Sequence, residues 1–235
     1  MNLTIDPTRI AAFDLETTGV DPRAAHVVTG SVVRLHGGQA HDNAGWMADP
    51  GIEIPDEAAA IHGVTNELAR AQGRPHGEVV ADIIATLQYC WDAGYTVVAF
   101  NAAYDLRILA THAPGFTIDG PVIDPMVIDR QQVPRRRGKR TLSRLCELHG
   151  IVLDNAHTAD ADALAAGQLA HTMLTRHYPA MSGAPTLEAM HAQRRWHEEQ
   201  QADLYAYLQR VGRDVSSFDF TPWPIDDIAD SPAFG

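Results

Sequence analysis

The chain has few of the features that mark membrane proteins, secreted proteins or zinc-stabilised domains. Only two of its 235 residues are cysteines, Cys90 and Cys146, and neither belongs to a Cys-x-x-Cys pair. The sequence therefore predicts neither a disulfide framework nor a zinc knuckle. No apolar run reaches about 18 residues, and no basic segment followed by an apolar one opens the chain. We expect no membrane span and no signal peptide, and hence a cytoplasmic protein.

Positive charge is also scarce. The chain has 18 Lys and Arg residues against 30 Asp and Glu residues, a formal net charge of −12. Proteins that wrap duplex DNA neutralise phosphates with Lys and Arg, so this balance argues against that class. An enzyme that holds a few nucleotides through metal ions is still allowed. The seven residues 134–140 contain five cations, which fits a solvated loop as well as a phosphate contact.

The remaining composition is that of a folded domain, because 45% of the residues are hydrophobic and 20% are charged. The order of the predicted elements is typical of an α/β fold with a mixed sheet and helices on its faces. We predict five strands and six helices. The strands are expected at 10–14, 27–35, 39–47, 96–100 and 121–124, and the helices near 56–61, 75–91, 104–112, 141–149, 158–176 and 187–211.

Two carboxylates lie at the end of the first predicted strand. Side chains alternate along a strand, so Asp14 and Glu16 share one face while Phe13 and Leu15 point into the core. Carboxylates held this close repel each other unless a proton or a cation lies between them. Taken alone, the pair fits a solvated strand end at least as well.

Two further segments change this interpretation. Asp105 lies in the first turn of a predicted helix that follows a buried strand, and Asp160 and Asp162 begin another helix just after His157. Helix capping would explain Asp105 alone, and a surface loop would explain the histidine alone. Together, carboxylates without nearby Lys or Arg indicate hard divalent cations, Mg²⁺ or Mn²⁺. The histidine adds a group that accepts a proton near neutral pH.

At these positions the chain resembles the DEDDh group of 3′→5′ exonucleases, which includes the proofreading subunit of bacterial DNA polymerase III. The resemblance spans residues 10 to about 175 and includes the His-x-x-x-x-Asp spacing that distinguishes this group from its tyrosine-using sister. Four segments carry it: Phe13-Asp14-Leu15-Glu16-Thr17-Thr18-Gly19, Ile61-His62-Gly63-Val64-Thr65, Asn101-Ala102-Ala103-Tyr104-Asp105 and His157-x-Ala159-x-x-Asp162.

The resemblance implies a set of catalytic residues and an RNase H-like fold. Asp14, Glu16 and Asp162 would hold the metal ion that activates water, and Asp14 with Asp105 would hold a second ion. His157 would be the general base. Asp160 does not match the pattern. The implied substrate-binding residues are Leu15, Thr17, His62 and Asn101. The implied domains are an exonuclease domain over 1–178 and a helical carboxyl-terminal extension over 179–235.

The implied reaction is hydrolysis of single-stranded DNA from its 3′ end to nucleoside 5′-monophosphates, in proofreading or repair. Alternatives are an RNA-trimming 3′→5′ exoribonuclease, a catalytically silent nucleic-acid-binding scaffold and an endonuclease of the RNase H fold. The implied partners are nucleic acid and a DNA polymerase or sliding clamp, and no membrane. Residues 201–205, Gln-Ala-Asp-Leu-Tyr, loosely resemble a clamp-binding peptide but lie within a predicted helix.

Overall fold

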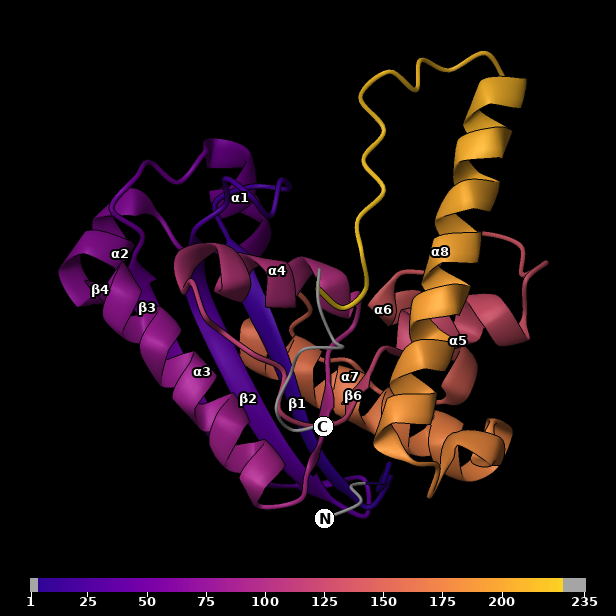
Figure 1. Cartoon of the computed structure of the whole chain (residues 1–235). Helices are drawn as coiled ribbons and strands as arrows, with labels where there is room; N and C mark the ends of the chain where they lie inside the picture. Colours follow the sequence, from indigo (N-terminus) through magenta and orange to yellow (C-terminus); the bar gives the residue numbers. More distant parts are fainter. Residues whose placement is uncertain (1–3, 226–235) are drawn as a thin grey trace.

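The computed structural model describes residues 4–225. Over this range the chain forms a six-stranded mixed sheet in the order β4-β3-β2-β1-β5-β6, with eight α-helices around it (Figure 1). The strands are β1 (Arg9–Thr17), β2 (Val27–His36), β3 (Gln39–Asp49), β4 (Arg74–Pro75), β5 (Thr96–Val98) and β6 (Val122–Ile123). The helices are α1 (Asp56–His62), α2 (Asn66–Gln72), α3 (His76–Asp92), α4 (Ala102–His112), α5 (Pro125–Gln132), α6 (Leu142–His149), α7 (Ala159–Thr172) and α8 (Thr186–Arg210).

Strand β1 lies inside the sheet and separates two hydrophobic cores. It pairs antiparallel with β2 and parallel with β5. Phe13 and Leu15 pack on one side, in the core that includes buried residues of α3 and α4. Ala12 packs on the other side, with α7. Because side chains alternate, Asp14 and Glu16 follow Ala12 toward the α7 face.

The two faces of the sheet are covered by different kinds of helix. Helix α3 buries a stripe of large apolar side chains, including Ile83 and Trp91, as its spacing predicts. Helix α7 is rich in alanine and lies close to the sheet. A Cβ atom on Gly167 would come within 2.9 Å of the Ala12 Cβ and 2.7 Å of Leu35. This close contact holds α7 against β1 and β2.

The predicted fold class is confirmed, with corrections to the element count. The sheet has six strands over the described residues, not five, because the two-residue strand β4 pairs with β3. So short a strand has no alternation that a sequence pattern could reveal. Helices α2 and α5 were also not predicted. Helix α5 begins with Pro125 and is capped by Asp124, whose carboxylate accepts from the N–H groups of Met126 and Val127.

The segment predicted as an extension makes specific contacts with the sheet. From α8, the Gln193 amide accepts the Asp124 N–H at 2.9 Å and donates to the Val122 carbonyl at 2.9 Å. The chain then runs back from the end of α8 toward the sheet (Figure 1), where the buried Trp223 indole donates to Asp124. No helix among the described residues is long and apolar enough to span a membrane.

Candidate active site

Three of the predicted carboxylates meet at the carboxyl end of β1. Asp14, Glu16 and Asp162 each place a carboxylate oxygen within 4.8 Å of the other two. Asp14 and Glu16 come from one face of β1, and Asp162 comes from the first turn of α7. The alternation of the strand and the close packing of α7 therefore bring together residues about 146 positions apart.

Asp105 reaches the same region from the first turn of α4. It is 4% exposed, and its charge raises the pKa of Asp14, so the two carboxyl groups are electrostatic neighbours. The turn before it is unusual, since Asn101 has a left-handed φ of 67°. The Asp124 carboxylate holds this turn by accepting the N–H groups of Asn101 at 3.1 Å and Ala102 at 2.9 Å. Asp124 thus positions the helix that carries Asp105.

Burial and mutual repulsion disfavour the ionised forms of these groups. Protein atoms surround the Asp14 carboxylate although the residue keeps some surface exposure, and burial raises its pKa well above the usual range. The charges of Asp105, Asp162 and Glu16 raise it further. The pKa of Glu16 is raised to about 7, chiefly by burial and then by Asp162. A divalent cation would reverse these shifts because it stabilises the charged carboxylates.

Within the part of the chain that the structure describes, one oxygen of Asp162 is left without a hydrogen-bond donor, as a metal ligand would be. Its Oδ2 accepts the His157 N–H at 3.1 Å, whereas its Oδ1 is buried without a hydrogen-bond partner among the described residues. A buried carboxylate oxygen without a donor is costly unless something positive binds it. The all-oxygen donor set of this carboxylate cluster suits Mg²⁺ or Mn²⁺.

His157 lies beside the carboxylate cluster but keeps its side chain exposed. Its backbone has a left-handed φ of 70°, and its N–H anchors Asp162. The charge of the imidazole also lowers the pKa of Asp162, against the larger effect of burial. The ring is therefore close enough to influence the cluster while it stays accessible to water. Asp160, which did not match the motif, is exposed and stands two positions before Asp162.

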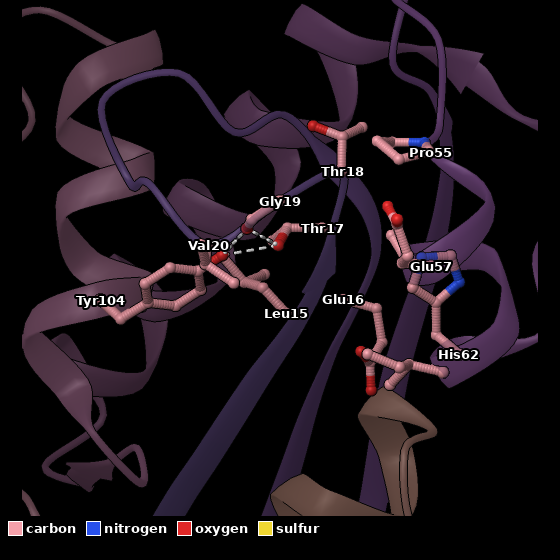
Figure 2. Close-up of a pocket in the computed structure, with 12 residues that line it drawn as sticks. Leu15, Glu16, Thr17, Thr18, Gly19, Val20, Pro55, Glu57, His62 and Tyr104 are labelled. Atoms are coloured by element: carbon pink, nitrogen blue, oxygen red, sulfur yellow. Dashed lines mark hydrogen bonds between the residues drawn. The ribbon is translucent and has the colours of Figure 1, made fainter.

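A pocket of about 410 Å³ opens beside Glu16. This volume is in the range of small-ligand sites. Figure 2 shows Glu16 from β1 and His62 from α1 bordering the same space. Of the predicted substrate-binding residues, Leu15, Thr17 and His62 line the pocket, while the exposed Asn101 is not among its lining residues. The lining is Leu15, Glu16, Thr17, Thr18, Gly19, Val20, Pro55, Glu57, Ala58, Ile61, His62 and Tyr104.

Tyr104 is a pocket residue that the sequence interpretation did not select. Its hydroxyl lies 2.7 Å from the Thr17 Oγ1 and donates to the Gly19 carbonyl, as the dashed lines in Figure 2 show. These bonds fix the end of β1 against α4. The position of Tyr104, directly before Asp105 in a recognised motif, is the signal that could have identified it.

His62 connects this pocket to a second hollow over β2 and β3. Glu16 and His62 line both spaces, and the second hollow also includes Trp46 and Thr158. Burial lowers the pKa of His62. Its Nδ1 accepts the Val64 N–H at 3.2 Å, and its Nε2 is buried without a partner among the described residues. In this tautomer the Nε2 carries a proton that it can donate to a ligand.

Two of the five cations in the basic segment 134–140 form ion pairs inside the fold. Arg136 and Arg140 both pair with Asp129, at 2.6 Å and 3.0 Å, and Asp129 is fully buried. These two cations neutralise a buried carboxylate of α5, so they are not available to phosphate. Arg135, Arg137 and Lys139 belong to the same segment and are not part of this ion-pair group.

The fold and the site together define a class of nuclease: an RNase H-like sheet with clustered carboxylates beside a pocket of nucleotide size. The comparisons with known proteins identify the family within this class. The family model described as Exonuclease (RNase_T) matches residues 11–170, and the chain belongs to this exonuclease family. The predicted resemblance to the DEDDh group and the predicted enzyme class are thereby confirmed.

The curated relatives that match are much longer proteins. The DNA polymerase III PolC-type of Lacticaseibacillus paracasei is 28% identical over 182 residues, which cover 76% of this chain and 12% of the relative. The PolC-type protein of Halalkalibacterium halodurans is 29% identical over 173 residues, which cover 71% of this chain and 11% of the relative. The chain therefore spans only about an eighth of these relatives.

Solved structures share the fold. E. coli exonuclease I in complex with a dA16 oligonucleotide superposes with a TM-score of 0.63 at 19% identity, covering 74% of this chain and 42% of that one. Exonuclease X in complex with 5′ overhanging duplex DNA superposes with a TM-score of 0.56 at 19% identity, covering 77% of this chain and 98% of that one.

Proposed function

We propose that the chain is a metal-dependent 3′→5′ exonuclease that removes nucleoside 5′-monophosphates from single-stranded DNA. One observation carries the proposal: Asp14, Glu16 and Asp162 converge within 4.8 Å beside a pocket of about 410 Å³. The acidic cluster would repel a phosphate on its own. It becomes a phosphate site only when divalent cations neutralise it, which fits a nuclease whose net charge is −12.

The carboxylates hold the proposed cations in two sets. Asp14, Glu16 and Asp162 would hold one ion, and Asp14 with Asp105 would hold the second, directly or through water. Bound Mg²⁺ or Mn²⁺ supplies a water of lowered pKa and stabilises the attacking and leaving oxygens at phosphorus. The raised pKa values of Asp14 and Glu16 support this assignment, because ionisation of both requires positive charge nearby.

His157 is proposed as the general base. It is exposed, so its imidazole can exchange a proton with solvent after each turnover. Its N–H bond to Asp162 keeps the loop next to the carboxylate cluster.

The pocket would make cleavage start at the 3′ end of the strand. We propose that the terminal base lies against the apolar side chains Leu15 and Ile61, and that the 3′ hydroxyl bonds near Glu16 and Thr17. The N–H at His62 Nε2, which has no partner among the described residues, is placed to donate to the terminal nucleotide. A pocket of this size suits one terminal nucleotide.

A role in replication or repair, beside a polymerase, is the proposed biological context. The curated relatives are DNA polymerases by name, and exonuclease I was solved with an oligonucleotide. The segment resembling a clamp-binding peptide is helical, and the Gln201 side chain donates to the Thr221 carbonyl and accepts its N–H. A sliding clamp would therefore have to bind this segment as a helix, and a polymerase is the better-supported partner.

The activity is tested with oligonucleotides labelled at either end, incubated with Mg²⁺ or Mn²⁺. A 5′ label should give a ladder that shortens with time, and a 3′ label should appear at once as a mononucleotide. A circular strand should stay intact, since it has no end. Cleavage of the circle would instead identify an endonuclease.

Matched variants and substrates separate the remaining alternatives. Asp14→Ala should abolish the ladder, and activity that survives this change would refute the metal site. Equal incubations with DNA and RNA of one sequence should show faster loss of DNA, whereas faster loss of RNA would identify an exoribonuclease. Binding of both strands without any product would identify a nucleic-acid-binding scaffold. Capture of interacting proteins from the source cells, scored for polymerase and clamp, tests the partner.

A further inference from the structure

A second cluster of potential metal ligands consists of three histidines outside the carboxylate cluster. His26, His76 and His112 each place one ring nitrogen within 4.8 Å of the others. Their ring centroids are 4.5–4.6 Å apart in all three pairs. The three residues are far apart in sequence: one precedes β2, one begins α3 and one ends α4. All three are half-buried, so an ion could enter and keep a water ligand.

Backbone contacts orient two of the rings for metal binding. His26 Nδ1 lies 2.7 Å from the Pro50 carbonyl, and His112 Nε2 lies 2.8 Å from the Ala25 carbonyl. A carbonyl only accepts, so both nitrogens carry the proton. The other nitrogen of each ring, His26 Nε2 and His112 Nδ1, is left with a free lone pair. This arrangement, one nitrogen bonded to a carbonyl and the other exposed, is that of metal-bound histidines.

The third ring needs one rearrangement. His76 Nε2 accepts the Val27 N–H at 3.1 Å, which leaves the proton on Nδ1. To offer a lone pair to an ion, His76 exchanges this single neutral hydrogen bond for a metal–nitrogen bond by turning about its Cβ–Cγ bond. Burial and, after it, the neighbouring His112 and His26 lower the pKa of His76 to about 4. The ring is therefore uncharged at neutral pH, as a ligand must be.

We propose that His26, His76 and His112 form a binding site for a borderline divalent transition-metal ion, Zn²⁺ in the first instance, with water completing four-coordination. Three imidazoles with one open position suit Zn²⁺ and Co²⁺, whereas Mg²⁺ requires oxygen ligands. The site is separate from the carboxylate cluster in its residues and in its donor chemistry.

The ion would join segments that frame the substrate pocket. His26 is bonded through its backbone to Thr18, whose N–H donates to the His26 carbonyl at 3.0 Å and whose Oγ1 accepts the His26 N–H at 3.0 Å. Thr18 lines the pocket. A metal ion held by the three rings would therefore fix the 18–26 loop to the start of α3 and the end of α4.

The test is a Co²⁺ and Zn²⁺ titration of the full chain in an Asp14→Asn, Asp162→Asn background, which disables the carboxylate cluster. One equivalent of Co²⁺ should give the intense visible bands of a four-coordinate nitrogen site, and Zn²⁺ should displace it. His112→Gln should weaken binding by about 100-fold or more, since even outer contacts change metal affinity 10- to 100-fold. His26→Gln should do the same.

A matched control exists in the same chain. His149 and His177 form a pair of rings with centroids 4.7 Å apart, and no third potential metal ligand joins them within the described residues, so His177→Gln should leave the titration unchanged. Circular dichroism checks that each variant is folded, and His26→Gln decides the question if His112→Gln does not fold. The proposal is overturned by a weak six-coordinate spectrum, or by binding that persists in the folded histidine variants. These readouts do not depend on nuclease activity.

Discussion

The carboxylate cluster and the histidine cluster each bring three potential metal ligands together, with opposite chemistry. In each, three side chains place a ligand atom within 4.8 Å of the others. The carboxylates repel one another, and burial raises the pKa values of Asp14 and Glu16. The three histidine rings are anchored by the backbone of Pro50, Ala25 and Val27. Ionised carboxylates this close together need a cation between them. The histidine rings can bind a cation but do not need one.

This difference explains what each cluster can do. A strained carboxylate cluster has high affinity for hard cations and loses charge repulsion when they bind, which suits an ion that takes part in chemistry. Imidazole ligands drawn from three separate elements suit an ion that links segments of the fold, at the cost of the one hydrogen bond that His76 gives up. The comparison therefore predicts that changes in the two clusters will affect different measurements.

The largest effect should come from Asp14, which is proposed to contact both catalytic ions. Asp14→Asn keeps the shape of the side chain and removes its charge. We expect turnover to fall by about 10⁴-fold or more, because metal ions supply several kcal/mol of transition-state stabilisation. Single-turnover hydrolysis of a labelled oligonucleotide measures this. His112→Gln is the matched control, and equal losses in both variants would mean that the two clusters do not differ in function.

The spacing of the residues along the chain decides how well the sequence predicts each cluster. Asp14 and Glu16 are two residues apart on a strand, and Asp162 follows His157 at a fixed interval, so local rules and the family resemblance identify both. The histidines 26, 76 and 112 have no common motif, and only the tertiary contacts of three separate elements bring them together. The sequence interpretation accordingly missed the histidine cluster altogether.

The same reasoning accounts for the fold. Apolar runs and the Gly37-Gly38 turn predicted β1 to β3, helix periodicity predicted α3, and alanine content predicted α7. The two-residue strand β4 contains too few residues for a period, and no apolar period was assigned to the segments that form α2 and α5. Asp124 was missed for another reason: its bonds to Ala102, Met126 and Trp223 arise from three different elements. The division into domains at residue 178 stays a prediction.

The next largest effect should come from His157, which distinguishes a proton acceptor from a structural histidine. Asn tolerates the left-handed φ of 70° but cannot act as a base. We expect His157→Asn to fold and to bind Mg²⁺ normally while turnover falls by about 10²–10⁴-fold, the usual range for general acid–base catalysis. The acidic limb of the pH–rate profile should also disappear. Near-normal turnover would show that another group accepts the proton.

Mg²⁺ should stabilise the protein through the carboxylates alone. At a concentration 100 times its Kd, a ligand that binds only the folded state adds about 2.7 kcal/mol, or roughly 5–10 °C in Tm for a chain of this size. We expect this shift in the unmodified chain and in His112→Gln, and its loss in Asp14→Asn, Asp162→Asn. Differential scanning fluorimetry measures all three. A smaller Mg²⁺ shift in His112→Gln would show that the clusters are coupled.

The smallest predicted effect is a change in stability caused by charge repulsion within the metal-free carboxylate cluster. Glu16 has a pKa of about 7 in the folded protein against an ordinary value of 4.5, so without metal the folded state binds more protons between these limits. Its contribution to stability is full below pH 4.5 and is lost as the pH rises through 7. Glu16 is only partly buried, so we expect about 1 kcal/mol after allowing for solvent screening. In EDTA, Glu16→Gln should therefore be more stable than the unmodified chain at pH 8 and similar at pH 5, as measured by urea unfolding.

Saturating Mg²⁺ should reverse the order at pH 8, because the carboxylate then binds a cation that the amide holds poorly. If Glu16→Gln showed the same pH dependence as the unmodified chain, the cluster would not be strained, and its contrast with the histidines would fail.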